Sequence, residues 1–271
     1  MQFRTEITIP RPSFEIEPHD RLFFVGSCFA ENVGRRFVHN KFKAIVNPYG
    51  TMYNPASVLH TIEHAVSDGT IPEQGIDVAV FTLGTNHVYI LKETGEIVDN
   101  CQKRPQRLFR EEELSVEECR DYLRRAILLL RKRNPDTKVI LTVSPIRYAK
   151  YGYHLSQLSK ATLLLAADSA CREEEQTEYF PAYEIMNDEL RDYRFYNPDM
   201  LHPSDQAVDY IYERFSATYF SAQTHRMQEE WRPLQAALSH RPFNPDSEEY
   251  KSFLAKAQAD ALAFERKWCL S

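Results

Sequence analysis

A pair of potential nucleophiles, Ser27-Cys28, follows an apolar run and Gly26 in the segment VGSCFAENVG. A glycine lets the backbone turn sharply after a strand, and the next residues have the spacing of a helix. Unpaired N–H groups and the helix dipole favour an anion at such a start, so a cysteine there gains thiolate character, whereas a serine needs an adjacent base. The alternative is an inert, buried cysteine in a turn of small residues.

A potential acid–base pair, Asp199 and His202, lies three residues apart in DMLHPS. A histidine can take a proton from a nucleophile and return it to a leaving group, and a carboxylate can fix its tautomer. The alternative is a turn carboxylate that caps a helix beside an exposed histidine.

Two further positions could stabilise an oxyanion: Gly50 in NPYGTMY and Asn86 in GTNH. A glycine N–H and a side-chain amide are the donors that such a hole requires. Each has a simpler alternative, a turn for Gly50 and a hairpin cap for Asn86. Both follow predicted strands, however, and so would lie with Ser27-Cys28 at the carboxyl ends of the strands, which form one rim of the sheet.

The elements that must position these residues alternate along the chain. Short apolar runs predict strands at 22–25, 43–46, 77–83, 138–143 and 178–180, and a hairpin is predicted to turn at Thr94-Gly95. Caps and apolar spacing predict helices that start after Gly26, at Pro55 and after Ser115, and helices over about 155–170, 182–192 and 205–220. Strands separated by helices predict an α/β fold, a mainly parallel sheet covered on both faces.

The C-terminal part differs in character, with charged amphipathic helices and no strand signals. We therefore predict an α/β domain over residues 1–220 and a helical extension over 221–271 that packs on it.

Composition narrows the function. The 271 residues are 43% hydrophobic, with net charge −6 and pI near 5.9, which argues against a nucleic-acid partner. No run approaches the roughly 18 to 20 apolar residues of a membrane span, and no secretory signal precedes the domain, so a cytoplasmic location is expected. The five scattered cysteines include no CxxC pair, which argues against a metal site or a disulfide framework. No GxGxxG or Walker A loop indicates a dinucleotide or nucleotide enzyme.

The order of several motifs resembles the GSCFA domain family over about 24–220. The motifs are VGSCFAENVG, NPYGTMYNP, FTLGT, VDNCQK, TVSPIR and YFPAYEIMNDELRDYRFYNPDMLHPS. That family is regarded as a relative of the SGNH or GDSL hydrolases, which cleave or transfer acyl groups, often on carbohydrates. The resemblance implies their three-layer α/β/α, flavodoxin-like fold.

The SGNH pattern assigns roles to individual positions. Its Gly-Asp-Ser block, second-strand glycine, Gly-x-Asn and Asp-x-x-His resemble Gly26-Ser27-Cys28, Gly50, Gly84-Thr85-Asn86 and Asp199-Met200-Leu201-His202. An ungapped register puts Cys28 at the nucleophilic serine, so we favour Cys28 over Ser27. Asn100 is the reserve candidate for Asn86. Lys160, Glu184 and Arg194 are candidates for substrate binding, or alternatively surface charges.

The leading hypothesis is an esterase, deacylase or O-acyltransferase that forms an acyl-enzyme on a small-molecule or carbohydrate ester. It needs no cofactor, although a transferase would use an acyl donor such as acetyl-coenzyme A. The rival is a non-catalytic module that uses the same fold to bind a glycan or a protein partner. The sequence leaves the oligomeric state open.

Overall fold

The computed structural model describes residues 4–99 and 104–270 of the chain. Five parallel strands form the central sheet: β1 (Arg21–Gly26), β2 (Lys43–Val46), β3 (Val78–Leu83), β7 (Lys138–Val143) and β8 (Thr177–Tyr179). Their order, β2-β1-β3-β7-β8, is 2-1-3-4-5 when only these strands are counted. This is the flavodoxin-like order, in which functional groups gather beyond the carboxyl ends of the strands.

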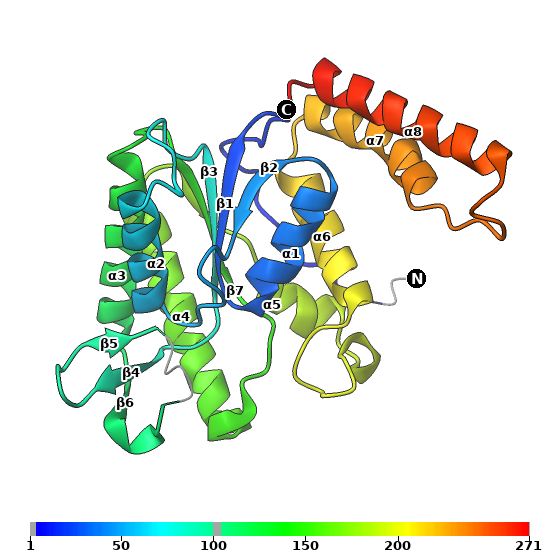
Figure 1. The fold of residues 1–271 in the computed structure, drawn as a ribbon. Coiled ribbons are helices and arrows are strands. Elements are labelled where there is room, and N and C mark those ends of the chain that lie inside the picture. Colours follow the sequence, from blue (N-terminus) through cyan, green and yellow to red (C-terminus); the bar gives the residue numbers. More distant parts are fainter. Residues whose placement is uncertain (1–3, 100–103, 271) are drawn as a thin grey trace.

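Helices cover both faces of the sheet (Figure 1). One face carries α1 (Cys28–His39) and α6 (Asp205–Tyr219), and the other carries α2 (Pro55–Ser67), α3 (Val116–Arg131) and α4 (Tyr153–Glu173). The α/β class and the three layers expected from the sequence are confirmed.

Alternating side chains of the strands build two cores. In β1, Phe23 and Val25 pack with α2, α3 and α4, whereas Leu22 and Phe24 pack with α1 and α6. All four are fully buried. A strand buried on both faces explains why its sequence is a continuous apolar run.

Local signals set the helix starts as predicted. The Asn54 side chain accepts from the Ser57 N–H ahead of Pro55, and Ser115 and Glu118 form a complete capping box. These bonds satisfy N–H groups that a helix start leaves without intrahelical partners.

A small antiparallel sheet follows β3. It consists of β4 (His87–Leu91), β5 (Ile97–Val98) and β6 (Phe109–Glu113), in the order β5-β4-β6. The predicted hairpin corresponds to β4 and β5. The sequence did not indicate β6, because FREEE places four exposed charged side chains after one buried phenylalanine and shows no apolar alternation.

The helix predicted at 182–192 is instead irregular. A single turn, α5 (Ala182–Glu184), passes into a π-helical turn, η3 (Ile185–Glu189). The Asn187 side chain donates to the Tyr183 carbonyl at 2.7 Å, the oxygen that the Asn187 backbone N–H would use in an α-helix. This competition accounts for the wider turn. Three short 3₁₀ turns are η1 (Gln106–Leu108), η2 (Ala149–Tyr151) and η4 (Tyr193–Phe195).

The chain ends in a helical hairpin, α7 (Ala222–Leu238) and α8 (Glu248–Lys267). Figure 1 shows it at the opposite end of the molecule from the small sheet. Trp231 of α7 is 3% exposed and donates to the His39 carbonyl at the end of α1, and Lys41 pairs with Glu265 of α8. Within the described residues, none of the helices has the length and apolar character to cross a membrane.

Candidate active site

The turn between β1 and α1 depends on Gly26. Its φ is +135°, and a Cβ there would lie 2.1 Å from the Thr82 carbonyl oxygen. The next residue, Ser27, donates its N–H to that same oxygen at 2.9 Å. Only glycine permits this conformation and this close approach to β3, so the sequence forces the chain to turn where Ser27 and Cys28 begin α1.

Ser27 and Cys28 have different environments. Ser27 is fully buried, and its hydroxyl caps α1 by accepting from the Phe29 N–H at 3.2 Å while it lies 3.0 Å from the Thr82 hydroxyl. Cys28 is the first residue of α1 and is partly exposed. The Ser27 hydroxyl therefore has a structural role, whereas the Cys28 thiol lies at the surface of the rim.

Competing effects act on the Cys28 thiol. Burial raises its pKa, while the charge of Lys160 and the N–H groups of Cys28 and Phe29 lower it. The negative charge of Asp199 raises the pKa slightly further. Burial has the largest effect, so the thiol is protonated at neutral pH and needs a base to become a nucleophile.

Lys160 is the buried lysine whose charge acts on the Cys28 thiol. Its side chain from α4 is 2% exposed, and Nζ donates to the carbonyls of Gly84 and Ser144 at 2.7 and 2.8 Å. These carbonyls follow β3 and β7, so Lys160 joins two strand ends at the rim. Burial lowers the pKa of Lys160 to about 7, and a thiolate at Cys28 would raise it.

Asp199 and His202 are hydrogen-bonded to each other, and their role as an acid–base pair stays a prediction. Asp199 Oδ2 lies 2.6 Å from His202 Nδ1, and Asp199 Oδ1 accepts the N–H groups of Leu201 and His202 at 2.8 and 3.0 Å. These hydrogen bonds lower the pKa of Asp199 to about 2. An ionised carboxylate on Nδ1 leaves Nε2 as the nitrogen that can exchange protons.

Arg147 attaches the loop that carries this pair to the end of β7. Its backbone N–H donates to the Leu201 carbonyl at 2.9 Å, and its guanidinium donates to the Met200 carbonyl at 3.0 Å. The start of α1 follows the carboxyl end of β1, and the loop is bonded to Arg147 after the carboxyl end of β7, so both lie at this rim of the sheet. Across residues 4–99 and 104–270, no hydrogen bond joins the Cys28 thiol to His202; catalytic contacts often tighten only when substrate binds.

Gly50 and Asn86 each have a hydrogen bond within the fold, and their oxyanion roles stay predictions. The Gly50 N–H closes a turn on the Asn47 carbonyl at 2.9 Å. The Asn86 side-chain amide is buried and donates to the Leu114 carbonyl at 2.8 Å, which anchors the loop before β4. The Gly50 N–H and one N–H of the Asn86 amide thus have carbonyl partners, and the second N–H of that amide is not used in this bond. Asn100, the reserve candidate, lies outside the described residues.

Two other candidates have contacts of their own. Glu184 accepts from the Tyr179 hydroxyl at 2.9 Å, and burial raises its pKa. The Arg194 side chain is 73% exposed and lies over the ring of Phe195. Neither contact involves Cys28 or His202.

Arg147 is a residue of this rim that the sequence motifs did not indicate. Its guanidinium carbon lies 4.3, 5.4 and 5.8 Å from the ring centres of Tyr153, Tyr196 and Tyr193. Its place four residues after β7, on the predicted rim, was the available signal.

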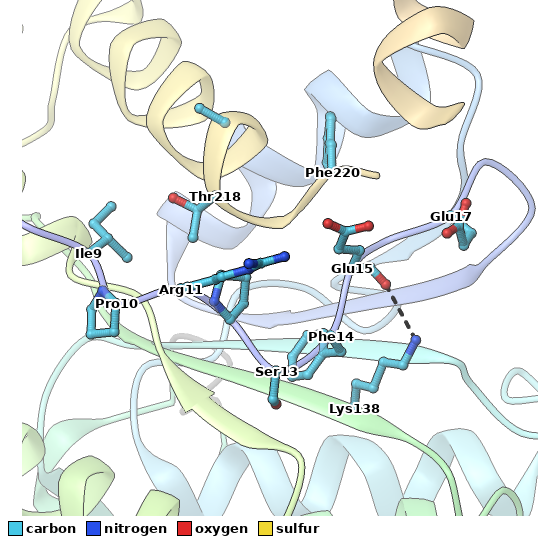
Figure 2. Close-up of a pocket in the computed structure, with 12 residues that line it drawn as sticks. Ile9, Pro10, Arg11, Ser13, Phe14, Glu15, Glu17, Lys138, Thr218 and Phe220 are labelled. Atoms are coloured by element: carbon cyan, nitrogen blue, oxygen red, sulfur yellow. Dashed lines mark hydrogen bonds between the residues drawn. The ribbon is translucent and has the colours of Figure 1, made fainter. Parts of the chain in front are cut away.

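The structure also has a hollow at the other end of the sheet. Figure 2 shows it between residues 9–17 and the end of α6. Its volume is about 710 Å³. It includes Lys138, the first residue of β7, and therefore lies at the amino ends of the strands. It is separate from the rim that carries Cys28.

Comparisons with known proteins show the family to which this chain belongs. A model described as the GSCFA family matches residues 21–76 and 73–215, and one described as the C-terminal domain of GSCFA domain proteins matches 231–269. A search among curated proteins finds no match.

Several solved structures are similar at low identity. A Streptococcus pneumonia protein whose description names platelet activating factor is 18% identical, with a TM-score of 0.49 over 74% of this chain and 84% of that one. A Clostridium thermocellum family 3 carbohydrate esterase is 10% identical, with a TM-score of 0.43 over 79% and 98%. An acetylxylan esterase from Geobacillus stearothermophilus is 12% identical, with a TM-score of 0.46 over 77% and 98%. These similarities are too distant to assign an activity to this chain.

Proposed function

Because this chain belongs to the GSCFA family, we propose that it is an ester hydrolase or acyltransferase that forms an acyl-enzyme on Cys28. One observation carries the proposal. Cys28 begins α1 on the same rim as the hydrogen-bonded Asp199–His202 pair, and the charge of the buried Lys160 acts on its thiol. A nucleophile, an oriented base and a local positive charge are the parts that acyl transfer requires.

The first half of the reaction acylates the cysteine. His202 Nε2 takes the thiol proton as sulfur attacks the ester carbonyl carbon, which gives a tetrahedral oxyanion. Helix-start N–H groups and the nearby Lys160 charge favour that anion. When the intermediate collapses, the carbon–oxygen bond to the alcohol breaks and His202 returns the proton to the leaving oxygen. The products are the free alcohol and a Cys28 thioester.

The second half regenerates the enzyme. His202 takes a proton from water or from an acceptor hydroxyl, whose oxygen attacks the thioester carbonyl. The carbon–sulfur bond breaks and the proton passes to sulfur, which releases an acid or a new ester. Asp199 stays ionised throughout, because its low pKa keeps it a carboxylate that stabilises the imidazolium. The chemistry needs no cofactor, and a transferase would use an acyl donor such as acetyl-coenzyme A. We propose small-molecule or carbohydrate acyl esters as substrates.

The test is to trap the acyl-enzyme. Protein treated with p-nitrophenyl acetate is quenched in acid, and its intact mass and peptides are measured. We expect one acetyl group on Cys28, loss of the group in Cys28→Ala, and acetylation slower by roughly 100-fold or more in His202→Gln. All variants carry Cys269→Ser, because that exposed thiol would react on its own. Cys171→Ala is the matched control and should be acetylated normally.

Other outcomes would change the proposal. Acetylation of Ser27, with Cys28→Ala still active, would move the nucleophile by one residue. If neither p-nitrophenyl acetate nor acetyl-coenzyme A acylates any form, the chain is not this enzyme. The second candidate, a non-catalytic module that binds a glycan or a protein, would then be preferred, and the raised pKa of the Cys28 thiol is the observation that favours it.

A further inference from the structure

A hollow lined by Arg147 has no part in the acyl-transfer steps described above. It has a volume of about 350 Å³ and lies among Arg147 after β7, Gln157 of α4, and the irregular segment 186–196. A smaller hollow of about 60 Å³ shares Arg147, Gln157 and Asn187 with it and extends to Lys160. Lys160 lines the smaller hollow and is the residue whose charge acts on the Cys28 thiol, so the two hollows together join the surroundings of Lys160 to a recess large enough for a sugar ring.

Two positive charges and one negative charge line the larger hollow. Arg147 and Arg191 are the cations and Asp192 is the anion. The Arg191 side chain is 80% exposed, and its closest carboxylate, Asp188, is 3.9 Å away. A net positive hollow on a chain of net charge −6 favours an anionic ligand.

The remaining lining suits a sugar. Tyr193 and Tyr196 offer flat apolar ring faces with hydroxyl groups, and Gln157 and Asn187 offer amides. Arg147 is held by the Met200 carbonyl and by the tyrosine rings, so its planar guanidinium is already oriented. A fixed guanidinium matches a carboxylate with two parallel hydrogen bonds.

We propose that this hollow is a subsite for a sugar that carries a carboxylate and forms the alcohol part of the acyl ester. The proposal rests on the proposed function, because the ester carbonyl would reach Cys28 while the sugar occupies the hollow. It narrows the substrate from acyl esters in general to acylated acidic saccharides.

Binding is measured without a reaction. A failure of the sugar to bind can then be distinguished from a failure to form the acyl-enzyme. D-glucuronate, D-glucose and glucose 6-phosphate are titrated into the full chain, and binding is followed by ligand-observed NMR. We expect glucuronate to bind, with glucose and glucose 6-phosphate at least several-fold weaker. Arg147→Gln should weaken glucuronate on the order of tenfold, the loss of a charged hydrogen-bonded pair. Arg191→Gln should weaken it by about two- to fivefold, as expected for an exposed charge.

Two variants separate binding from damage to the fold. Arg147→Gln also removes the bond to Met200, so Tyr193→Ala, whose side chain is 68% exposed, serves as the second test and should also weaken glucuronate. Arg172→Gln makes the same charge change at the far end of α4, where the side chain is 76% exposed, and should bind normally. Equal binding of glucose and glucuronate, preference for glucose 6-phosphate, or affinities that none of the Arg147, Arg191 and Tyr193 variants alters would overturn the proposal.

Discussion

At the scale of single residues, Lys160 makes stability depend on pH. Burial lowers its pKa from 10.5 to about 7, so between these pH values the unfolded chain binds more protons at this residue than the folded chain. Its contribution to the free energy of unfolding therefore rises as pH increases from about 7 to 10. We expect Lys160→Met to abolish that rise, so that its stability relative to wild type falls on the order of 1 kcal/mol per pH unit between pH 7 and 9.

Urea unfolding at pH 6, 7, 8 and 9 measures this difference. The hydrogen bonds to Gly84 and Ser144 are lost at every pH, so the slope is the informative quantity and not the absolute value. Lys251→Met, at a side chain that is 56% exposed, should give a difference that does not vary with pH. A flat difference for Lys160→Met would show that the lysine does not titrate in this range.

Residue roles could be predicted only where local sequence determines them. The spacing of Asp199 and His202 gives a hydrogen-bonded pair because both lie in one turn. The partners of Asn86 and Gly50 could not be anticipated in the same way. Asn86 is bound by Leu114, 28 residues along the chain, and an isolated turn glycine does not reveal where its N–H points.

At the scale of elements, the contact between α1 and β2 requires Gly34. A Cβ on Gly34 would lie 2.6 and 2.7 Å from the two methyl carbons of Val46. Alanine improves helix propensity by about 1 kcal/mol, but overpacking of a tight contact costs about 1 to 3 kcal/mol. We expect Gly34→Ala to lower stability by about 1 kcal/mol and Gly34→Ala/Val46→Ala to recover part of that loss.

A double-mutant cycle measured by urea unfolding tests the coupling. The two changes should be non-additive, because each concerns the same few atoms. Gly69→Ala is a control in which the added methyl group meets no neighbouring atom, because nothing lies within 4 Å of its Cβ position. The φ of +81° at Gly69 still strains an alanine there. A Gly34→Ala variant more stable than wild type would show that the helix moves away from β2 without cost.

The elements themselves were more predictable than their irregularities. Continuous apolar runs and caps identified the parallel strands and the long helices, because both signals are local. The π-helical turn at 185–189 depends on one Asn187 side chain that competes for a backbone carbonyl, and β6 is formed by pairing with β4. Neither leaves an apolar pattern in the sequence.

At the scale of the whole molecule, the proposed site and the contacts of the helical hairpin are far apart. The carboxyl ends of β1, β3 and β7 carry Cys28, the Lys160 contacts and the Asp199–His202 loop, as the topology of parallel sheets predicted. The helical hairpin contacts the far end of α1 through His39, about 16 Å along the helix from Cys28 at 1.5 Å per residue. The location of these contacts could not be predicted, because amphipathic spacing does not show what a helix packs against.

This separation predicts that the hairpin stabilises the protein without affecting catalysis. Trp231 is 3% exposed, lies 5.1 Å from the Phe264 ring and donates to His39, so Trp231→Ala removes a large buried contact. We expect it to lower the free energy of unfolding by about 3 kcal/mol while kcat/KM for p-nitrophenyl acetate stays within about twofold. Urea unfolding measures the free energy of unfolding, ester hydrolysis measures kcat/KM, and hydrogen exchange measures the protection of each helix. If only peptides of α7 and α8 lose protection and the main transition is unchanged, the hairpin unfolds as a separate unit; a large loss of activity would show that it acts on the distant rim.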